Sequence, residues 1–276
     1  MKRTGIFFLY LIGERLSDFP EELAGILDRT NISFYEAFYE LTPTPEELLL
    51  KVHSPQMIDR VKQTIYYETA LYSTGGTVQA AERIWRNEIG NAFVFTGTGD
   101  HHAGRDYFGG GCHFNGAALA IAKLRGEFGA RRFAILDTDS HHGDGTRDIF
   151  KDDEDVLHVC LCSQTLDDST NVDIAIPYSI TDEQYLGILE AEFIPRIADF
   201  KPEIIFWEFG YDATSGDYGS KGLSLDCHPE IARIVSRAAD SACQGRMIAI
   251  LCGGSRRDIA RYCIPRIINC LAELFR

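Results

Sequence analysis

The stretch Phe133-Ala-Ile-Leu-Asp-Thr-Asp-Ser-His-His-Gly-Asp-Gly-Thr146 places five ionisable side chains directly after four apolar residues. The apolar residues predict a short buried strand, and the two glycines predict that it ends in a turn. On a strand Asp137, Asp139 and His141 face one side, because side chains alternate. Such groups are costly to bury unless they pair or bind a metal. Carboxylate and imidazole donors without a thiolate are typical of a catalytic divalent-metal site, and the alternative is a surface turn whose acids face solvent.

Three other apolar segments, residues 92–96, 203–209 and 247–251, also run into glycines and polar groups. These are, in order, Gly97-Thr-Gly-Asp100-His101-His102, Gly210-Tyr211-Asp212 and Cys252-Gly253-Gly254-Ser255. Strands and helices alternate in the second half of the chain, with helices expected at 182–200, 229–243 and 259–275. This pattern predicts an α/β fold of three layers, a mostly parallel sheet with helices on both faces. Because ligands bind beyond the carboxyl ends of such strands, the polar ends are expected to meet in one crevice.

The first half of the chain contributes a strand and several helices. Residues 5–12 are interpreted as a strand rather than a signal peptide, because no small-residue cleavage site follows them. Helices are expected at residues 19–29, 44–53, 54–64, 74–87 and 115–127, and residues 97–111 form a loop that contains six glycines. No linker or internal repeat interrupts the pattern, so one domain over residues 1–276 is expected.

Composition narrows the function classes. The formal charge of −14 argues against a nucleic-acid-binding surface and is compatible with cationic substrates. No segment has the roughly 20 apolar residues that span a bilayer, so no membrane association is expected. The eight cysteines form no Cys-x-x-Cys pair and mostly have apolar neighbours. This predicts buried free thiols in a reducing cytoplasm, and the default role of Cys160 and Cys162, which share one face of a strand, is core packing.

Four separated motifs together carry a resemblance to one family. The segment Asp137-x-Asp139-x-His141-His142-Gly143-x-Gly145-Thr146 resembles the metal motif of the histone deacetylase and acetylpolyamine amidohydrolase family, within the arginase-deacetylase superfamily. The other three are His101-His102-Ala103, Gly110-Gly111-Cys112-His113-Phe114-Asn115 and Gly210-Tyr211-Asp212-Ala-x-x-Gly-Asp217. Residues 46–55 and the pair Gly253-Gly254 are similar as well. Order and spacing match over about residues 40–275, and the resemblance implies the arginase-deacetylase-like fold.

The resemblance implies a function for each matching residue. It implies that Asp139, His141 and Asp212 bind Zn²⁺, with Fe²⁺ as the alternative, and that metal-bound water attacks an N-acyl amide. It further implies four catalytic residues, with His102 as general base, His101 as a charge-stabilising imidazolium, Asp137 orienting His101 and Asp144 orienting His102. The substrate and oxyanion region would comprise Gly110, Gly111, Gly254 and Ser255. A structural K⁺ site is implied at the backbone carbonyls of Asp137, Asp139, His141 and Leu161, although Cys160 replaces a helpful hydroxyl there.

The sequence departs from the family pattern at three places. Ser255 stands where the family usually has a tyrosine that polarises the substrate carbonyl. Either water or a residue such as Tyr107, Tyr211 or Tyr218 replaces it, or activity towards simple acetyl-lysine is poor. Gly111 stands where a phenylalanine often lines the acyl-lysine channel, which predicts a wider channel. Residues 19–22, Phe-Pro-Glu-Glu, replace a His-Pro-Glu-Arg stretch.

These departures leave three functional hypotheses. The first is a metal-dependent deacylase for acyl-lysine, acylpolyamine or a similar acylated amine. The alternative is a catalytically weakened acyl-binding or scaffold protein that retains the metal. The third, a binuclear-metal ureohydrolase, would require further ligating acids where His101 and His102 stand.

Overall fold

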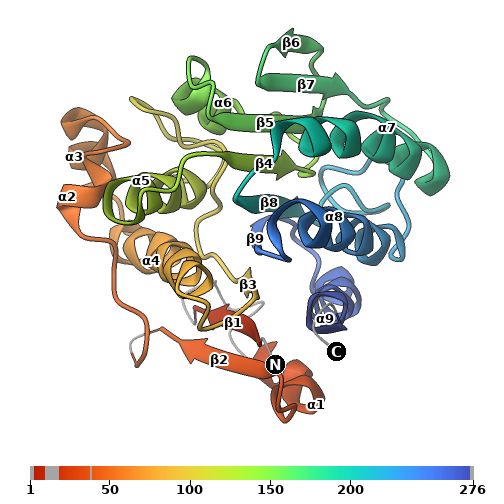
Figure 1. The fold of residues 1–276 in the computed structure, drawn as a ribbon, viewed down its shortest axis with the longest axis horizontal. Coiled ribbons are helices and arrows are strands. Elements are labelled where there is room, and N and C mark those ends of the chain that lie inside the picture. Colours follow the sequence, from red (N-terminus) through yellow and green to blue (C-terminus); the bar gives the residue numbers. More distant parts are fainter. Residues whose placement is uncertain (1–2, 10–18, 38, 274–276) are drawn as a thin grey trace.

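The structure, a computed structural model, describes residues 3–9, 19–37 and 39–273. Its strands are β1 (Thr4–Phe8), β2 (Ile32–Glu36), β3 (Asn91–Val94), β4 (Phe133–Asp137), β5 (Val156–Cys162), β6 (Leu166–Asp168), β7 (Asn171–Ala175), β8 (Ile204–Gly210) and β9 (Met247–Gly253). They form a single sheet in the order β2-β1-β3-β9-β8-β4-β5-β7-β6 (Figure 1). All pairs are parallel except β6 with β7.

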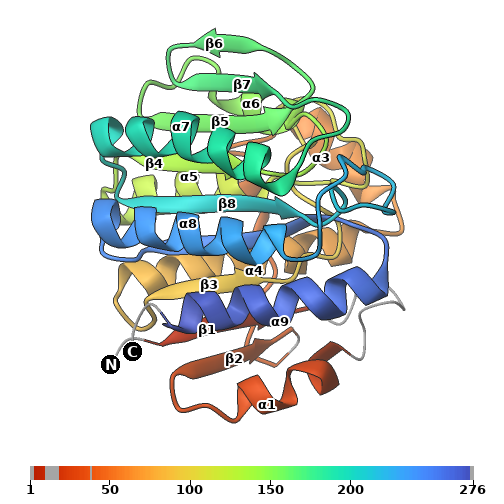
Figure 2. The ribbon, with the colours of Figure 1, turned by 90° about the vertical axis from the view of Figure 1, so that its right-hand side faces the viewer.

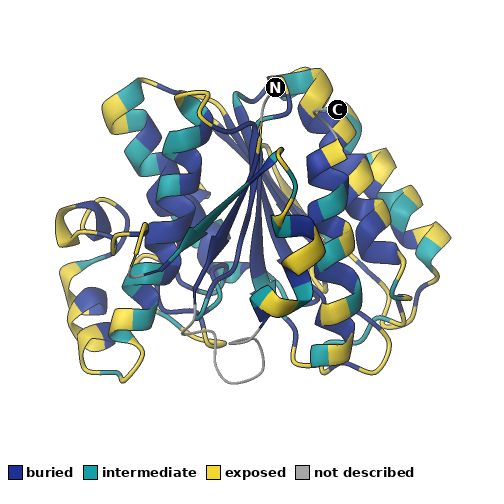
Figure 3. Ribbon diagram, turned by 90° about the horizontal axis from the view of Figure 1, so that it is seen from below, coloured by how far each residue is buried: buried dark blue, intermediate teal, exposed yellow. Residues whose placement is uncertain are grey.

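Helices cover both faces of this sheet (Figure 1; Figure 3, where the strands are seen between two layers of helices). One face carries α4 (Tyr67–Trp85) and α5 (Gly116–Phe128), and the other carries α7 (Asp182–Phe200), α8 (Cys227–Cys243) and α9 (Arg257–Glu273). The shorter elements are η1 (Phe19–Leu23), α1 (Ala24–Leu27), α2 (Glu46–Leu49), α3 (Pro55–Lys62) and α6 (Asp144–Phe150). The expected three-layer α/β fold is confirmed.

The central strands are buried along their whole length, as strands covered on both faces must be. Every residue of β4, β5 and β8 is buried. Helix starts are set by local chemistry: Asn115 caps α5 by accepting a hydrogen bond from the Ala118 N–H at 2.8 Å, and Thr181 and Gln184 form a capping box at α7. None of the helices in the described residues is both long and apolar enough to cross a membrane.

Several boundaries differ from the sequence-based expectation. The first helix is divided into η1 and α1, and α4 begins at Tyr67 rather than at residue 74. Strands β2, β6 and β7 were not expected. The glycines after residue 142 were interpreted as a turn, but Asp144 opens α6 there, so the metal motif leads directly into a helix. The end of the first expected strand, residues 10–12, lies outside the described residues.

Candidate active site

The predicted site residues follow the carboxyl ends of adjacent strands. β3, β9, β8 and β4 are neighbours in the sheet, and in Figure 2 their arrows point to the same edge, where the connecting loops gather. The loop after β4 contributes Asp139 and His141, and the segment after β8 contributes Asp212. Strand order therefore unites groups that are more than 70 residues apart in sequence.

The three expected metal ligands converge on one point. His141 Nδ1 lies 2.9 Å from Asp139 Oδ1 and 3.0 Å from Asp212 Oδ2. Both carboxylates are buried, whereas His141 is partly exposed on the outer side. Zinc bonds of about 2.0–2.2 Å to nitrogen and oxygen at tetrahedral angles separate donor atoms by about 3.3–3.5 Å. The three atoms thus fit one ion with small side-chain movements.

The charge of the site also suits a divalent ion. The hydrogen bonds to Asp139 and Asp212 raise the pKa of His141 to about 10, so the two carboxylates favour a positive charge beside them. Within the described part of the chain, no lysine or arginine forms an ion pair with Asp139 or Asp212. Two buried carboxylates without a fixed cation require a countercharge, and the donor set of two oxygens and one nitrogen fits Zn²⁺ or Fe²⁺.

Two adjacent histidines lie beside these ligands. Asp137 Oδ2 lies 2.8 Å from His101 Nδ1, and Asp144 Oδ1 lies 2.6 Å from His102 Nδ1. The two imidazole rings are 4.1 Å apart between centroids. Burial disfavours a charge on His101, but the carboxylates of Asp137 and Asp139 outweigh it and raise the pKa of His101 well above its usual value. In each ring a carboxylate therefore holds Nδ1, which leaves Nε2 available for other contacts.

A buried polar network, which was not predicted from the sequence, supports the histidine pair. The Thr146 backbone N–H donates to the carbonyl oxygen of His101 at 3.0 Å. The Thr146 hydroxyl lies 2.9 Å from both Asn115 Nδ2 and Glu208 Oε1. Burial raises the pKa of Glu208 well above its usual value. The only sequence signal was an acid inside the apolar strand IIFWEFG.

At the rim of the site, Asp217 holds Ser255, the residue that replaces the family's usual tyrosine. The Ser255 hydroxyl donates to Asp217 Oδ1 at 2.6 Å, and the Ser255 N–H is 3.0 Å from Asp217 Oδ2, so this side chain is bound to the loop after β8. Tyr218 instead reaches the same place. Its ring stacks on His141 with centroids 5.5 Å apart, and its hydroxyl oxygen accepts a hydrogen bond from the Gly254 N–H at 3.3 Å.

The other two tyrosines considered from the sequence lie differently. Tyr211 is fully buried, with its ring packed against Gly254. Tyr107 is partly exposed and packs against Gly104 and Asp144. At Gly111, where a wider channel is predicted, φ is +83° and nothing lies within 4 Å of an added Cβ atom.

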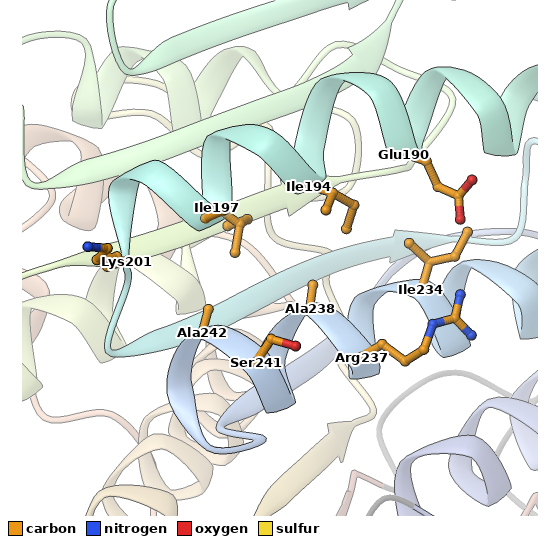
Figure 4. Close-up of a pocket in the computed structure, with 10 residues that line it drawn as sticks. Glu190, Ile194, Ile197, Lys201, Ile234, Arg237, Ala238, Ser241 and Ala242 are labelled. Carbon is orange, nitrogen blue, oxygen red and sulfur yellow. The ribbon is translucent and has the colours of Figure 1, made fainter.

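Two hollows differ in their relation to this site. A cavity of about 40 Å³ lies against it, lined by Thr96, Gly97, Gly99, Tyr211, Leu251, Cys252, Gly253 and Gly254. A larger groove of about 540 Å³ lies between α7 and α8 (Figure 4) and is lined by Ile194, Ile197, Ile234 and Ala238 among others. None of its lining residues belongs to the metal or histidine groups.

Known proteins resemble this chain over most of its length. The histone deacetylase domain family matches residues 14–271. A probable deacetylase of Archaeoglobus fulgidus is 32% identical over 204 residues, 68% of this chain and 56% of that protein. A histone deacetylase-like amidohydrolase of Pseudomonas aeruginosa is 24% identical over 279 residues, 90% of this chain and 73% of that protein. The chain thus spans about half of the archaeal relative.

A solved structure agrees on the fold. The crystal structure of the HDA15 HD domain superposes with a TM-score of 0.85 at 20% identity, covering 99% of this chain and 89% of that one. The expected resemblance is confirmed along nearly the whole sequence. The chain belongs to the histone deacetylase family.

Proposed function

We propose that this protein is a zinc-dependent amide hydrolase that removes the acyl group from an N-acylated amine. The observation that supports this most strongly is the convergence of Asp139, His141 and Asp212 beside a histidine pair whose Nδ1 atoms are each held by a carboxylate. One domain over residues 1–276 would carry the activity. Zn²⁺ bound there would polarise the substrate carbonyl and lower the pKa of its bound water to roughly 7.

The two histidines would have different roles, proton transfer for one and charge stabilisation for the other. His102 is the more exposed of the pair, and with its Nδ1 proton donated to Asp144 its Nε2 is free to accept a proton from water and to pass it to the leaving amine. His101, buried and held by Asp137, would remain an imidazolium and stabilise negative charge as it develops on the carbonyl oxygen. Gly110 lies against the His102 ring and would form the substrate-side wall with Gly111.

Tyr218 would supply the hydrogen bond that Ser255 cannot. Because the Tyr218 oxygen accepts from Gly254, its own O–H proton is free to be donated to a substrate carbonyl. The stacking on His141 supports this role by keeping the phenol beside the ligand group. A potassium site at the carbonyls of Asp137, Asp139, His141 and Leu161 remains a prediction.

The substrate class proposed is an acylated amine, either acyl-lysine or an acylpolyamine. Among the relatives, a zebrafish protein named polyamine deacetylase HDAC10 is 24% identical over 253 residues, and the formal charge of −14 suits cationic substrates. Zinc-loaded protein should release the acyl group from at least one member of a panel of acetyl-lysine peptides, acetylpolyamines and longer acyl amines.

The decisive variant is His102→Ala. General-base loss should lower kcat by about 10²–10⁴-fold, while the zinc content stays at the level of the unmodified protein because His102 is outside the ligand group. If the unmodified, zinc-loaded protein binds acylated amines but hydrolyses none of them, the second hypothesis, an acyl-binding or scaffold protein that retains its metal, would replace the enzyme. The observation that favours this alternative is Ser255 in the position where the family usually has a tyrosine.

A further inference from the structure

A second group of metal-binding side chains lies beside the candidate active site. Cys160 and Cys162 alternate along β5 and therefore face the same side of the sheet. The register of β5 with β7 pairs Cys160 directly with Asp173. His142 reaches the same place from the loop between β4 and α6. We call these four residues the thiol cluster.

Their donor atoms are as close as the ligands of one ion. One donor atom from each residue of the thiol cluster lies within 4.8 Å of the other three. His142 Nδ1 is 3.4 Å from Cys162 Sγ and 3.6 Å from Asp173 Oδ1. In a tetrahedral zinc site with Zn–S of about 2.3 Å and Zn–N of about 2.0 Å, donor atoms are about 3.3–3.8 Å apart. The distances measured from His142 already match that spacing.

An unsatisfied buried atom points into the cluster. Asp173 is only 3% exposed, and its Oδ1, which faces His142, accepts no hydrogen bond from any described residue. Its other oxygen, Oδ2, is paired with the Arg147 guanidinium at 3.0 Å. A buried carboxylate oxygen without a donor is unfavourable, so its position requires a partner. A metal ion between the four side chains would provide one.

The charges also balance around an ion. Two thiolates and the Asp173 carboxylate carry three negative charges, with His142 neutral. Zn²⁺ together with the neighbouring Arg147 carries three positive charges. The Asp137 carboxylate, 3.8 Å from Cys160 Sγ, has its own partner in His101 at 2.8 Å. The Gln164 N–H, 3.5 Å from Cys162 Sγ, adds a hydrogen bond of the kind that supports a thiolate ligand. His142 is partly exposed, which leaves a route by which the ion can enter.

We propose that His142, Cys160, Cys162 and Asp173 form a second, structural site for Zn²⁺ or a similar thiophilic divalent ion. It is separate from the Asp139–His141–Asp212 group, which contains no sulfur. Four protein ligands leave no open position for water, so the role is to tie β5, β7 and the loop after β4 together rather than to perform chemistry. Thiolate ligands exclude K⁺ and Mg²⁺.

The test uses Co²⁺, which reports its ligands by absorption. Metal-depleted full-length protein, kept reduced, is titrated with Co²⁺. We expect two equivalents per chain and a thiolate-to-cobalt charge-transfer band in the near ultraviolet. Cys162→Ser should lose that band and one equivalent. Asp212→Ala, which removes a ligand of the sulfur-free group, should lose one equivalent but keep the band. Cys270→Ser, a buried cysteine of α9 outside the cluster, should resemble the unmodified protein.

The proposal is overturned if the unmodified protein binds Co²⁺ without a thiolate band, a result that needs no variant to fold. It is also overturned if Cys160→Ser and Cys162→Ser, shown to be folded by circular dichroism, both keep the band at full intensity. Neither result depends on whether the protein hydrolyses acyl amines, so this test and that of the proposed function fail separately.

Discussion

Ser255 and Tyr218 lie close together at the end of β9, where the family pattern has a single tyrosine. Asp217 accepts hydrogen bonds from the backbone N–H groups of both Ser255 and Arg256, as well as from the serine hydroxyl. This carboxylate therefore fixes the turn after β9, and the serine hydroxyl is bound to it. The phenol of Tyr218, one residue after Asp217, occupies the neighbouring space against Gly254.

The first prediction concerns Tyr218→Phe. Removing the hydroxyl should lower kcat by about 10²–10³-fold, the usual cost of losing one oxyanion donor, with a smaller effect on KM. The phenyl ring keeps its stacking on His141, so metal content should not change. Tyr178→Phe, an 88% exposed tyrosine outside the site, is the matched control and should leave kcat as it is.

The substitution Ser255→Tyr distinguishes between a serine that holds the turn and a site that has lost its electrophile. Ser255→Tyr should reduce activity, because it breaks the hydrogen bond to Asp217 that holds the turn. A large gain on acetyl-lysine peptides would contradict this, and would identify the site as one that lacks its electrophile. Unchanged activity of Tyr218→Phe would likewise remove Tyr218 from the chemistry.

The sequence could predict that some of the residues of the two proposed metal sites lie together, but not others, for a physical reason. Asp139 and His141 could be identified because a single strand and turn carries them, and Asp212 because it ends another strand. Cys160 and Cys162 were interpreted as core packing, because Asp173 comes to lie beside Cys160 only through the register of β5 with β7. Such a pairing across an unexpected strand leaves no periodic signal in the sequence.

At the level of elements, the histidine pair is positioned by the start of α6. The Thr146 N–H bonds the His101 carbonyl, and the backbone of Gly145 passes against that of Ala103. A methyl group at Gly145 would lie 2.5 Å from Ala103 backbone atoms, closer than real Cβ contacts come. The glycine is thus required for close approach between the loop that carries the histidines and the helix that carries Asp144.

Gly145→Ala should accordingly damage both stability and activity. Overpacking of this kind costs about 1–3 kcal/mol of unfolding free energy, and separation of the two segments should lower kcat as well. Urea unfolding and acyl-release assays measure the two effects. Gly187→Ala in α7 is the control, because nothing lies within 4 Å of its added methyl group; it should raise stability by about 0.4–1 kcal/mol. Equal behaviour of the two variants would refute the close-packing argument.

The elements that could be predicted are those with a strong internal pattern. The apolar runs of β4, β5, β8 and β9 and the long helices α7, α8 and α9 are found within a few residues of their expected positions. α6 was missed because its first turn contains the glycines of the metal motif, which indicate a turn when considered alone. β2, the edge strand ISFYE, is only half buried and lacks a clear alternation.

Across the whole molecule, three buried histidines link stability to pH. His53, His158 and His228 lie in the loop after α2, in β5 and in α8, and burial lowers the pKa of each from 6.5 to about 4. His53 is held between the Gly104 carbonyl and the Asn115 N–H, and His228 pairs with the Thr214 hydroxyl at 2.7 Å. All three are therefore neutral in the folded protein at neutral pH, in different parts of the structure.

These three histidines are predicted to destabilise the fold as the pH falls from about 6.5 to 4. In that window the unfolded chain binds three protons that the native protein excludes, so the free energy of unfolding decreases as pH falls, by up to about 1.4 kcal/mol per pH unit for each histidine. His228→Gln, which can keep the Thr214 hydrogen bond, removes one of these protons. The free energy of unfolding is measured with urea at several pH values in the presence of a metal chelator. Its dependence on pH should be smaller for the variant than for the parent, by up to about 1.4 kcal/mol per pH unit. Parallel curves would mean that His228 is protonated inside the folded protein, and that its burial beside Thr214 and Phe209 does not exclude the charge.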